Sequence, residues 1–185
     1  MPVTLGAPRE HSFDEPLGLL SDCHRRIEKF LRILQKVLDL AAGQPLNEEQ
    51  RRAVEAALTY FKTAAPQHTQ DEEESLFPRL RAAGSPQVAA ALETLAALEH
   101  DHQTADVQHA RVDAWYRRWM SDGPLPKAEE QALRETLVEI TEMYGRHIAV
   151  EDHEIFPRAG QALAADDRGK VGAEMARRRE RPPPR

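Results

Sequence analysis

The same thirteen-residue pattern occurs twice in this chain, and the duplication restricts the possible folds more than any other feature. The first copy, residues 68–80, is HTQDEEESLFPRL, and the second, residues 147–159, is HIAVEDHEIFPRA. In both copies a glutamate follows the histidine by four positions, and Phe-Pro-Arg begins nine positions after it. A repeat of this kind indicates two halves with matched structure.

A second histidine precedes each copy at nearly the same distance. His24 lies 44 residues before His68, and His102 lies 45 residues before His147. A lone histidine on an apolar helix face is more often a hydrogen-bonded core residue than a ligand. Matched duplication is hard to obtain from packing alone, so we interpret the set as a metal centre with pseudo-two-fold symmetry.

Composition limits the class of protein and of metal site. The 185 residues suit one domain, and the net charge of −6 argues against a general nucleic-acid binder. The chain has one cysteine, Cys23, so a metal would be held by nitrogen and oxygen ligands, which suit iron, manganese or zinc. We find no apolar stretch or signal that predicts a membrane span or export, so the cytoplasm is the default compartment.

Apolar residues recur every three or four positions in four stretches, which predicts four amphipathic helices. The stretches cover about 17–42, 47–83, 85–122, and from 127 onward. No strand signal separates them. We therefore predict an all-α fold, an antiparallel up-down four-helix bundle over residues 16–160. Residues 1–15 would form an N-terminal arm, and residues 161–185 a short extra C-terminal helix followed by a basic, proline- and arginine-rich tail.

Local signals refine this prediction. Asn47 and Gln50 resemble a capping box at the start of the second helix, and Ser85-Pro86 resembles the start of the third. Pro66 is expected to kink the second helix. Phe77-Pro78 and Phe156-Pro157 are expected to end or bend their helices, and the terminal arginines to form a solvated tail.

Helical geometry selects one carboxylate from each acidic run. Each residue advances about 100° around the axis, so position i+4 returns to within about 40° of i. Glu72 therefore shares a face with His68, while Asp71, Glu73 and Glu74 are expected to point sideways or away. A bare carboxylate on an apolar face costs several kcal/mol unless it is compensated, and lysine and arginine are scarce on these faces. Bound cations would compensate both glutamates.

The predicted ligands of the metal centre are His24, His68, Glu72, His102, His147 and Glu151. The two glutamates, one from each half, are expected to bridge two ions, with the histidines as terminal ligands. The spacing leaves open which histidine binds which ion. Two histidines and two bridging carboxylates leave coordination positions open on each ion, as expected of a site that binds a further molecule.

These residues resemble those of the hemerythrin-like (HHE cation-binding) domain family, over about residues 13–180. The matching motifs are His24, His68-x-x-x-Glu72 with Leu76-Phe77-Pro78, His102, and His147-x-x-x-Glu151 with Ile155-Phe156-Pro157. The stretch from Glu174 to Arg178 is also similar to stretches common in bacterial members. The resemblance implies two iron ions, bridged by two carboxylates and an oxo or hydroxo group. It also implies binding of dioxygen or chemistry with related oxidants; zinc or manganese could occupy the same ligands.

One departure separates the chain from the oxygen carriers of that family, which have two histidines four residues apart on the third helix. Here Leu98 and Asp106 occupy the positions four away from His102. Asp106 could substitute as an oxygen ligand, as could Glu28 four residues after His24. The departure argues against reversible oxygen storage and favours a centre that senses or reacts with dioxygen, peroxide or nitric oxide.

Several interpretations remain open at this point. A sensor without turnover is favoured over an enzyme that consumes peroxide or oxygen, and iron sensing or storage is a third reading; no protein partner is indicated. A ferritin-like enzyme would need Glu-x-x-His on two helices, and only Glu99-x-x-His102 fits. His109 could line the pocket and Tyr144 could bond to an iron-bound group, although core packing accounts for both.

Overall fold

Every regular element in the described part of the chain is helical, which confirms the all-α prediction. The computed structural model describes residues 10–84 and 92–180. Its helices are α1 (Pro16–Ala41), α2 (Glu48–Gln70), α3 (Phe77–Ala83), α5 (Leu92–Asp122), α6 (Lys127–Val150), α7 (Phe156–Ala162) and α8 (Ala165–Glu180). Two π-helices interrupt the series, η1 (Asp71–Leu76) after α2 and η2 (Glu151–Ile155) after α6. Among these helices, none is both long enough and apolar enough to cross a membrane.

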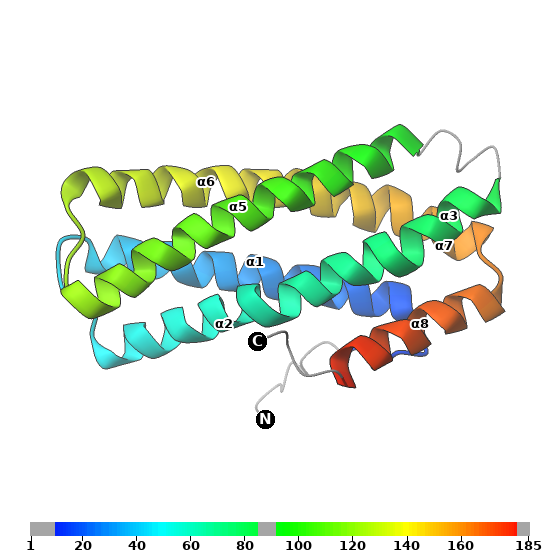
Figure 1. Cartoon of the computed structure of the whole chain (residues 1–185), viewed down its shortest axis with the longest axis horizontal. Helices are drawn as coiled ribbons and strands as arrows, with labels where there is room; N and C mark the ends of the chain where they lie inside the picture. Colours follow the sequence, from blue (N-terminus) through cyan, green and yellow to red (C-terminus); the bar gives the residue numbers. More distant parts are fainter. Residues whose placement is uncertain (1–9, 85–91, 181–185) are drawn as a thin grey trace, which may run out of the picture.

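Four long segments lie side by side (Figure 1). They are α1, the run α2–η1–α3, α5, and the run α6–η2–α7. α1 packs against α2 and α6, and α5 packs against the same two helices, so each segment has two neighbours. α8 covers one end of this arrangement through contacts with α1, α2 and η1.

The predicted helix boundaries follow from local chemistry. Asn47 and Gln50 form the capping box, because the side-chain oxygen of each accepts the backbone N–H of the other at 2.9 Å. Gly84 ends α3 with φ of 59°, a left-handed conformation that glycine adopts without steric cost. Pro66 lies inside α2 without ending it. The predicted start at Ser85-Pro86 lies outside the described residues.

The apolar interior is divided into two clusters, with a polar layer between them. The division is visible along each long segment. On α1, Leu20 belongs to one cluster and Ile27 to the other, with His24 between them. On α5, Leu98 and Ala105 flank His102 in the same way. The helical period that buries the apolar residues therefore also buries a histidine at the same level of each segment.

The helical run continues through both Phe-Pro pairs, and the chain changes its hydrogen-bond register just before them. The N–H of Phe77 donates to the carbonyl of Glu72, and the N–H of Phe156 donates to the carbonyl of Glu151, both five residues back. Each proline then lies in the first turn of the next α-helix, where a missing N–H costs least. Such π-turns frequently occur at functional sites.

The arginines near the end of α8 bind the fold, contrary to the prediction of a solvated tail. Arg178 and Arg179 donate to Asp71 at 2.8 and 2.7 Å, and Arg178 also donates to Ser75 at 2.8 Å. Asp71 is fully buried rather than pointing away, because these two guanidinium groups compensate its charge. α8 is thereby fixed to η1, next to Glu72. The prolines beyond it lie outside the described residues.

Replacement of Gly172 by alanine is expected to weaken the packing of α8. A Cβ at Gly172 would collide with the carbonyl oxygen of Phe13, which belongs to backbone and cannot turn aside. We expect Gly172→Ala to lower the free energy of unfolding by about 1–3 kcal/mol, as overpacking does. Denaturant-induced unfolding followed by circular dichroism measures this change.

Gly169 provides the matched control in the same helix, because a Cβ there meets nothing within 4 Å. Gly169→Ala should leave stability unchanged or raise it by up to about 1 kcal/mol through helix propensity. A Gly172→Ala protein as stable as the Gly169→Ala protein would contradict the packing described for α8.

Candidate metal centre

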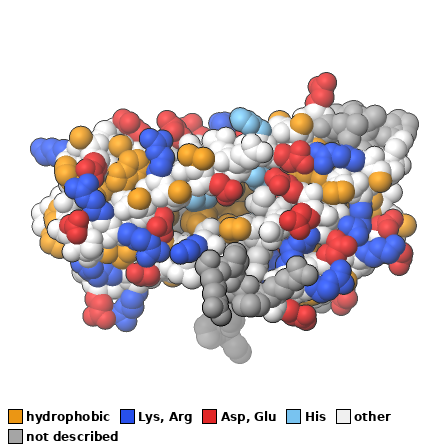
Figure 2. Space-filling model, in the orientation of Figure 1, with side chains coloured by type: hydrophobic (Ala, Val, Ile, Leu, Met, Phe, Trp, Pro, Cys, Tyr) orange, Lys and Arg blue, Asp and Glu red, His pale blue; other side chains and the backbone are white. Residues whose placement is uncertain are grey.

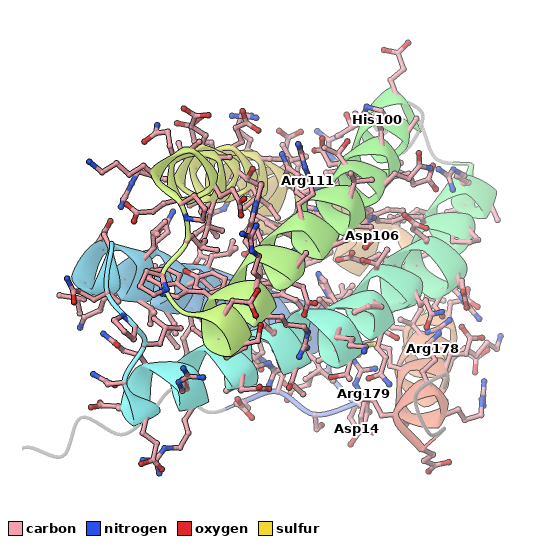
Figure 3. The ribbon with its side chains drawn as sticks, turned by 60° about the vertical axis from the view of Figure 1, so that its left-hand side comes forward. Asp14, His100, Asp106, Arg111, Arg178 and Arg179 are labelled. Carbon is pink, nitrogen blue, oxygen red and sulfur yellow. The ribbon has the colours of Figure 1, made fainter. Side chains whose placement is uncertain are left out.

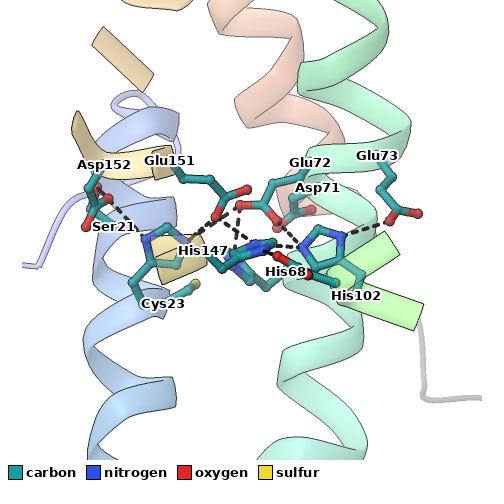
Figure 4. Close-up of polar contacts among 12 residues, drawn as sticks. Ser21, Cys23, His68, Asp71, Glu72, Glu73, His102, His147, Glu151 and Asp152 are labelled. Carbon is teal, nitrogen blue, oxygen red and sulfur yellow. Dashed lines mark hydrogen bonds and ion pairs between the residues drawn. The ribbon is translucent and has the colours of Figure 1, made fainter. Parts of the chain in front are cut away.

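Six buried side chains from the four long segments meet in the polar layer between the two apolar clusters (Figure 4). They are the six predicted ligands: His24 on α1, His68 on α2, Glu72 on η1, His102 on α5, His147 on α6 and Glu151 on η2. Each is at most 5% exposed. The structure therefore brings together the whole set that the sequence repeat singled out.

The six residues form two overlapping groups that share both glutamates. One group contains His24 and His68, and the other contains His102 and His147. In each group, one nitrogen or oxygen atom per residue lies within 4.8 Å of the others. Two cation positions with common carboxylates fit this geometry.

All four histidines direct Nε2 toward the carboxylates. The Nε2 atoms of His24 and His147 lie 3.0 and 3.1 Å from the same oxygen of Glu151, Oε2. Glu72 Oε1 lies 3.4 Å from His68 Nε2, and Glu72 Oε2 lies 3.4 Å from His102 Nε2. Glu72 thus presents one oxygen to each histidine pair.

The carboxylate oxygens of the centre lack hydrogen-bond donors. Among the described residues, none donates a hydrogen bond to either oxygen of Glu72 or of Glu151, and their only basic neighbours within 4 Å are the four histidines. Buried polar atoms are almost always paired, because an unpaired one forfeits its hydration without compensation. Four such oxygens at one point fit a site that could hold cations.

A second set of carboxylates contacts three of the histidines from outside. Asp152 lies 3.0 Å from Nδ1 of His24, Glu73 lies 2.8 Å from Nδ1 of His102, and Asp101 lies 3.3 Å from Nδ1 of His147. A carboxylate at Nδ1 holds the proton there and leaves the Nε2 lone pair facing inward. These contacts orient three of the four imidazoles for metal binding.

These outer carboxylates were not predicted from the sequence. Glu73 was expected to point sideways or away because it cannot share the face of His68, and helical spacing considers one helix only. Glu73 instead faces His102 on a neighbouring segment. A signal was present, since Glu73 follows Glu72 and Asp152 follows Glu151 at the same place in the two repeats.

Comparison with known proteins agrees with this geometry. The model of the hemerythrin HHE cation binding domain matches residues 15–159. The chain belongs to this family. An uncharacterized protein of Haemophilus influenzae is 28% identical over 170 residues, which are 91% of this chain and 92% of that protein. No solved structure matches the chain significantly.

In the absence of a bound cation, protonated histidines compensate the negative charge of the two glutamates in this hemerythrin-family chain. Burial disfavours charge on His102, but attraction to the ionised carboxylates of Glu72 and Glu73 outweighs it and raises the pKa of this histidine to about 9. Burial likewise disfavours charge on Glu72, yet the surrounding imidazoles hold its pKa well below the usual range. Burial lowers the pKa of His68 to about 4, so this imidazole is neutral near pH 7. The ionised glutamates are thus ready for a cation, which would displace protons from the histidines.

Two residues that the sequence left open as additional ligands lie outside the centre. Glu28 on α1 is exposed, and so is Asp106 on α5, which Figure 3 labels. Neither belongs to the two groups that could hold an ion. The position one helical turn from a ligand histidine is therefore not sufficient, because Asp106 lines a cavity between α2 and α5 instead of entering the centre. The centre therefore has one carboxylate from each repeat, and Glu28 and Asp106 add no further carboxylate to it.

His109 and Tyr144 lie beside the centre rather than in it. His109 Nε2 is 3.2 Å from the hydroxyl of Tyr144, and the Tyr144 ring centroid is 6.2 Å from that of His147. His109 also stacks on Phe61 at 4.0 Å and lines a cavity of about 310 Å³ between α2 and α5. His109 thus lines a pocket, as the sequence had left open, and packs against the core as well.

The stability of the protein should depend on pH through His109. Burial lowers the pKa of His109 to about 3, whereas an unfolded histidine titrates near 6.5. As pH falls below about 6.5 the unfolded chain takes up a proton that folded His109 does not, so stability decreases. We expect His109→Phe, which keeps the stack on Phe61, to reduce the loss between pH 7 and pH 5 by about 2 kcal/mol. Unfolding by urea at both pH values measures the difference.

His100 is the control for this measurement, because it is exposed at the outer end of α5 (Figure 3). His100→Phe removes a histidine without changing a buried one and should leave the wild-type pH dependence in place. An unchanged pH dependence in His109→Phe would show that His109 is not held neutral by the fold.

Proposed function

We propose that this protein holds two iron ions between the four long segments and uses them to bind or sense a small oxidant. Dioxygen, nitric oxide and peroxide are the ligands in question. The observation that carries the proposal is the set of four buried carboxylate oxygens on Glu72 and Glu151 that accept no hydrogen bond from any described residue. Lysine and arginine do not compensate them, and nitrogen and oxygen ligands of this kind suit iron.

The geometry supports a specific distribution of ligands. His24 and His68 would hold one ion, and His102 and His147 the other, since these are the pairs in the two groups. Glu72, with one oxygen toward each pair, and Glu151 would bridge the two positions. We take the four long segments to be the predicted antiparallel up-down bundle, because each packs against two neighbours around this centre.

The protein itself contributes orientation, charge and exclusion of water. Asp152, Glu73 and Asp101 fix three imidazoles with Nε2 inward. The π-turns place each glutamate carbonyl in a five-residue hydrogen bond, and Asp71 ties η1 to α8. When bound, a pair of iron ions would supply adjacent one-electron redox changes at coordination positions that the histidines and glutamates leave open.

The burial of the centre favours a small ligand. With every ligand residue at most 5% exposed, a large substrate could not reach the ions without rearrangement of the bundle. A molecule with two non-hydrogen atoms needs far less space. This supports binding or sensing of dioxygen, nitric oxide or peroxide over catalysis on an extended substrate, and it leaves turnover of peroxide as the enzymatic alternative.

Iron sensing or handling is the second candidate function, and the same uncompensated oxygens favour it. If two cations neutralise Glu72 and Glu151, their loss leaves two buried carboxylates balanced only by histidine protonation. The iron-free protein should then be less stable and more open at η1 and η2. A large change in melting temperature on iron loading, without reactivity toward oxidants, would favour this function.

Metal analysis tests the proposal directly. Protein purified without oxygen should contain about two irons per chain by mass spectrometry of the metals, and Glu151→Gln should contain fewer than one. Exposure to air should produce a near-ultraviolet oxo-to-iron absorption band in the wild type. Glu154→Gln is the control, since Glu154 is an exposed acidic residue three positions further along the same repeat. One zinc per chain, or equal iron in both variants, would contradict the proposal.

A further inference from the structure

The outer contacts of the four histidines are unequal. His24, His102 and His147 each have a carboxylate within 3.3 Å of Nδ1. His68 is 3% exposed, and its Nδ1 has no hydrogen-bond partner among the described residues. The Nε2 of His68 faces Glu72 like the others, so the difference is confined to the outer side of the ring.

The sequence repeat shows where the missing partner would come from. The two-fold relation pairs His24 with His102 and His68 with His147. Asp101 precedes His102 and contacts His147; the residue that precedes His24 is Cys23. By the two-fold relation, the side chain at position 23 corresponds to the outer carboxylate that Asp101 offers to His147. At this position, which should contact His68, the chain has a thiol.

Cys23 does not replace that carboxylate. Its thiol is buried and accepts a hydrogen bond from Arg26 at 3.3 Å. The sulfur is therefore engaged by Arg26 and not by His68. A thiol sulfur is a weak acceptor, and it lacks the negative charge that Asp101 offers to His147. Figure 4 shows Cys23 on α1 and Asp152, the partner of His24, near the same end of the centre.

We propose that the two metal positions are unequal, and that the position formed by His24 and His68 binds its ion more weakly than the position formed by His102 and His147. This inference rests on the proposed function. The reason is that a metal draws electron density from an imidazole and leaves the Nδ1–H more positive, which an outer carboxylate stabilises. His102 and His147 both have that stabilisation, whereas of the other pair only His24 has it.

The expected difference is large enough to measure. Loss of an outer partner of a metal-bound histidine typically weakens metal affinity about 10- to 100-fold. The dissociation constants of the two positions should therefore differ by about tenfold or more. Asp101 is a positioning residue in this account, because it acts on the metal through His147.

Titration of the metal-free full-length chain with cobalt(II), followed by calorimetry and visible absorption, tests the inference. The wild type should bind two ions in two resolved steps. Asp101→Asn keeps the shape of the side chain at a partly exposed site but removes its charge, so the tighter step should weaken about tenfold or more and the two steps should approach each other. Asp106→Asn, at an exposed position on the same helix, should leave both steps unchanged.

A second variant tests the same claim from the other half. Cys23→Asp supplies the absent carboxylate and should strengthen the weaker step, whereas Cys23→Ser should not. Two equal affinities in the wild type would overturn the inference alone, and so would a wider separation of the steps in Asp101→Asn. Fewer than two ions per wild-type chain would overturn the proposed function and this inference with it. If Cys23→Asp does not fold, the Asp101→Asn result decides.

Discussion

Two ionised glutamates buried in an apolar interior are the constraint on which the rest of this structure depends. Glu72 and Glu151 are fully buried, and their only basic neighbours within 4 Å among the described residues are histidines. An isolated buried carboxylate is too costly for a marginally stable domain to tolerate without compensation. Four imidazoles and the cations they would bind provide that compensation, and each long segment of the chain contributes one imidazole to it.

The elements around the centre are placed to hold those two glutamates. Both lie at π-turns, where the carbonyl of the glutamate accepts an N–H from five residues further on. α8 then fixes the first of these turns through Arg178 and Arg179, which compensate the buried carboxylate of Asp71. On the face of the molecule that Figure 2 shows, acidic and basic side chains alternate over the helices, so the surface charge is mixed in sign.

Much of this could be predicted from the sequence because helical periodicity and duplication act on the same residues. The histidines fall on the apolar faces, so predicting the helices also predicts their convergence, and all six residues do meet.

What could not be predicted depends on contacts between segments. Asp71 was expected to point away because one helix was considered, yet two arginines more than a hundred positions later make its burial tolerable. The π-turns have no periodicity signal of their own, so the sequence could not show that the helical run continues through Phe77-Pro78 and Phe156-Pro157. Asp106 had to be left open as a ligand, because helical spacing cannot tell which of two neighbouring faces turns inward.

Anomalous diffraction at the iron absorption edge, from crystals of the iron-loaded protein, tests the central claim most directly. The account predicts two anomalous peaks about 3.5–4 Å apart, as in other paired metal sites. One peak should lie against Nε2 of His24 and His68, the other against Nε2 of His102 and His147, with carboxylate oxygens of Glu72 and Glu151 between them. A single peak, or peaks at surface carboxylates with Glu72 and Glu151 unbound, would contradict it.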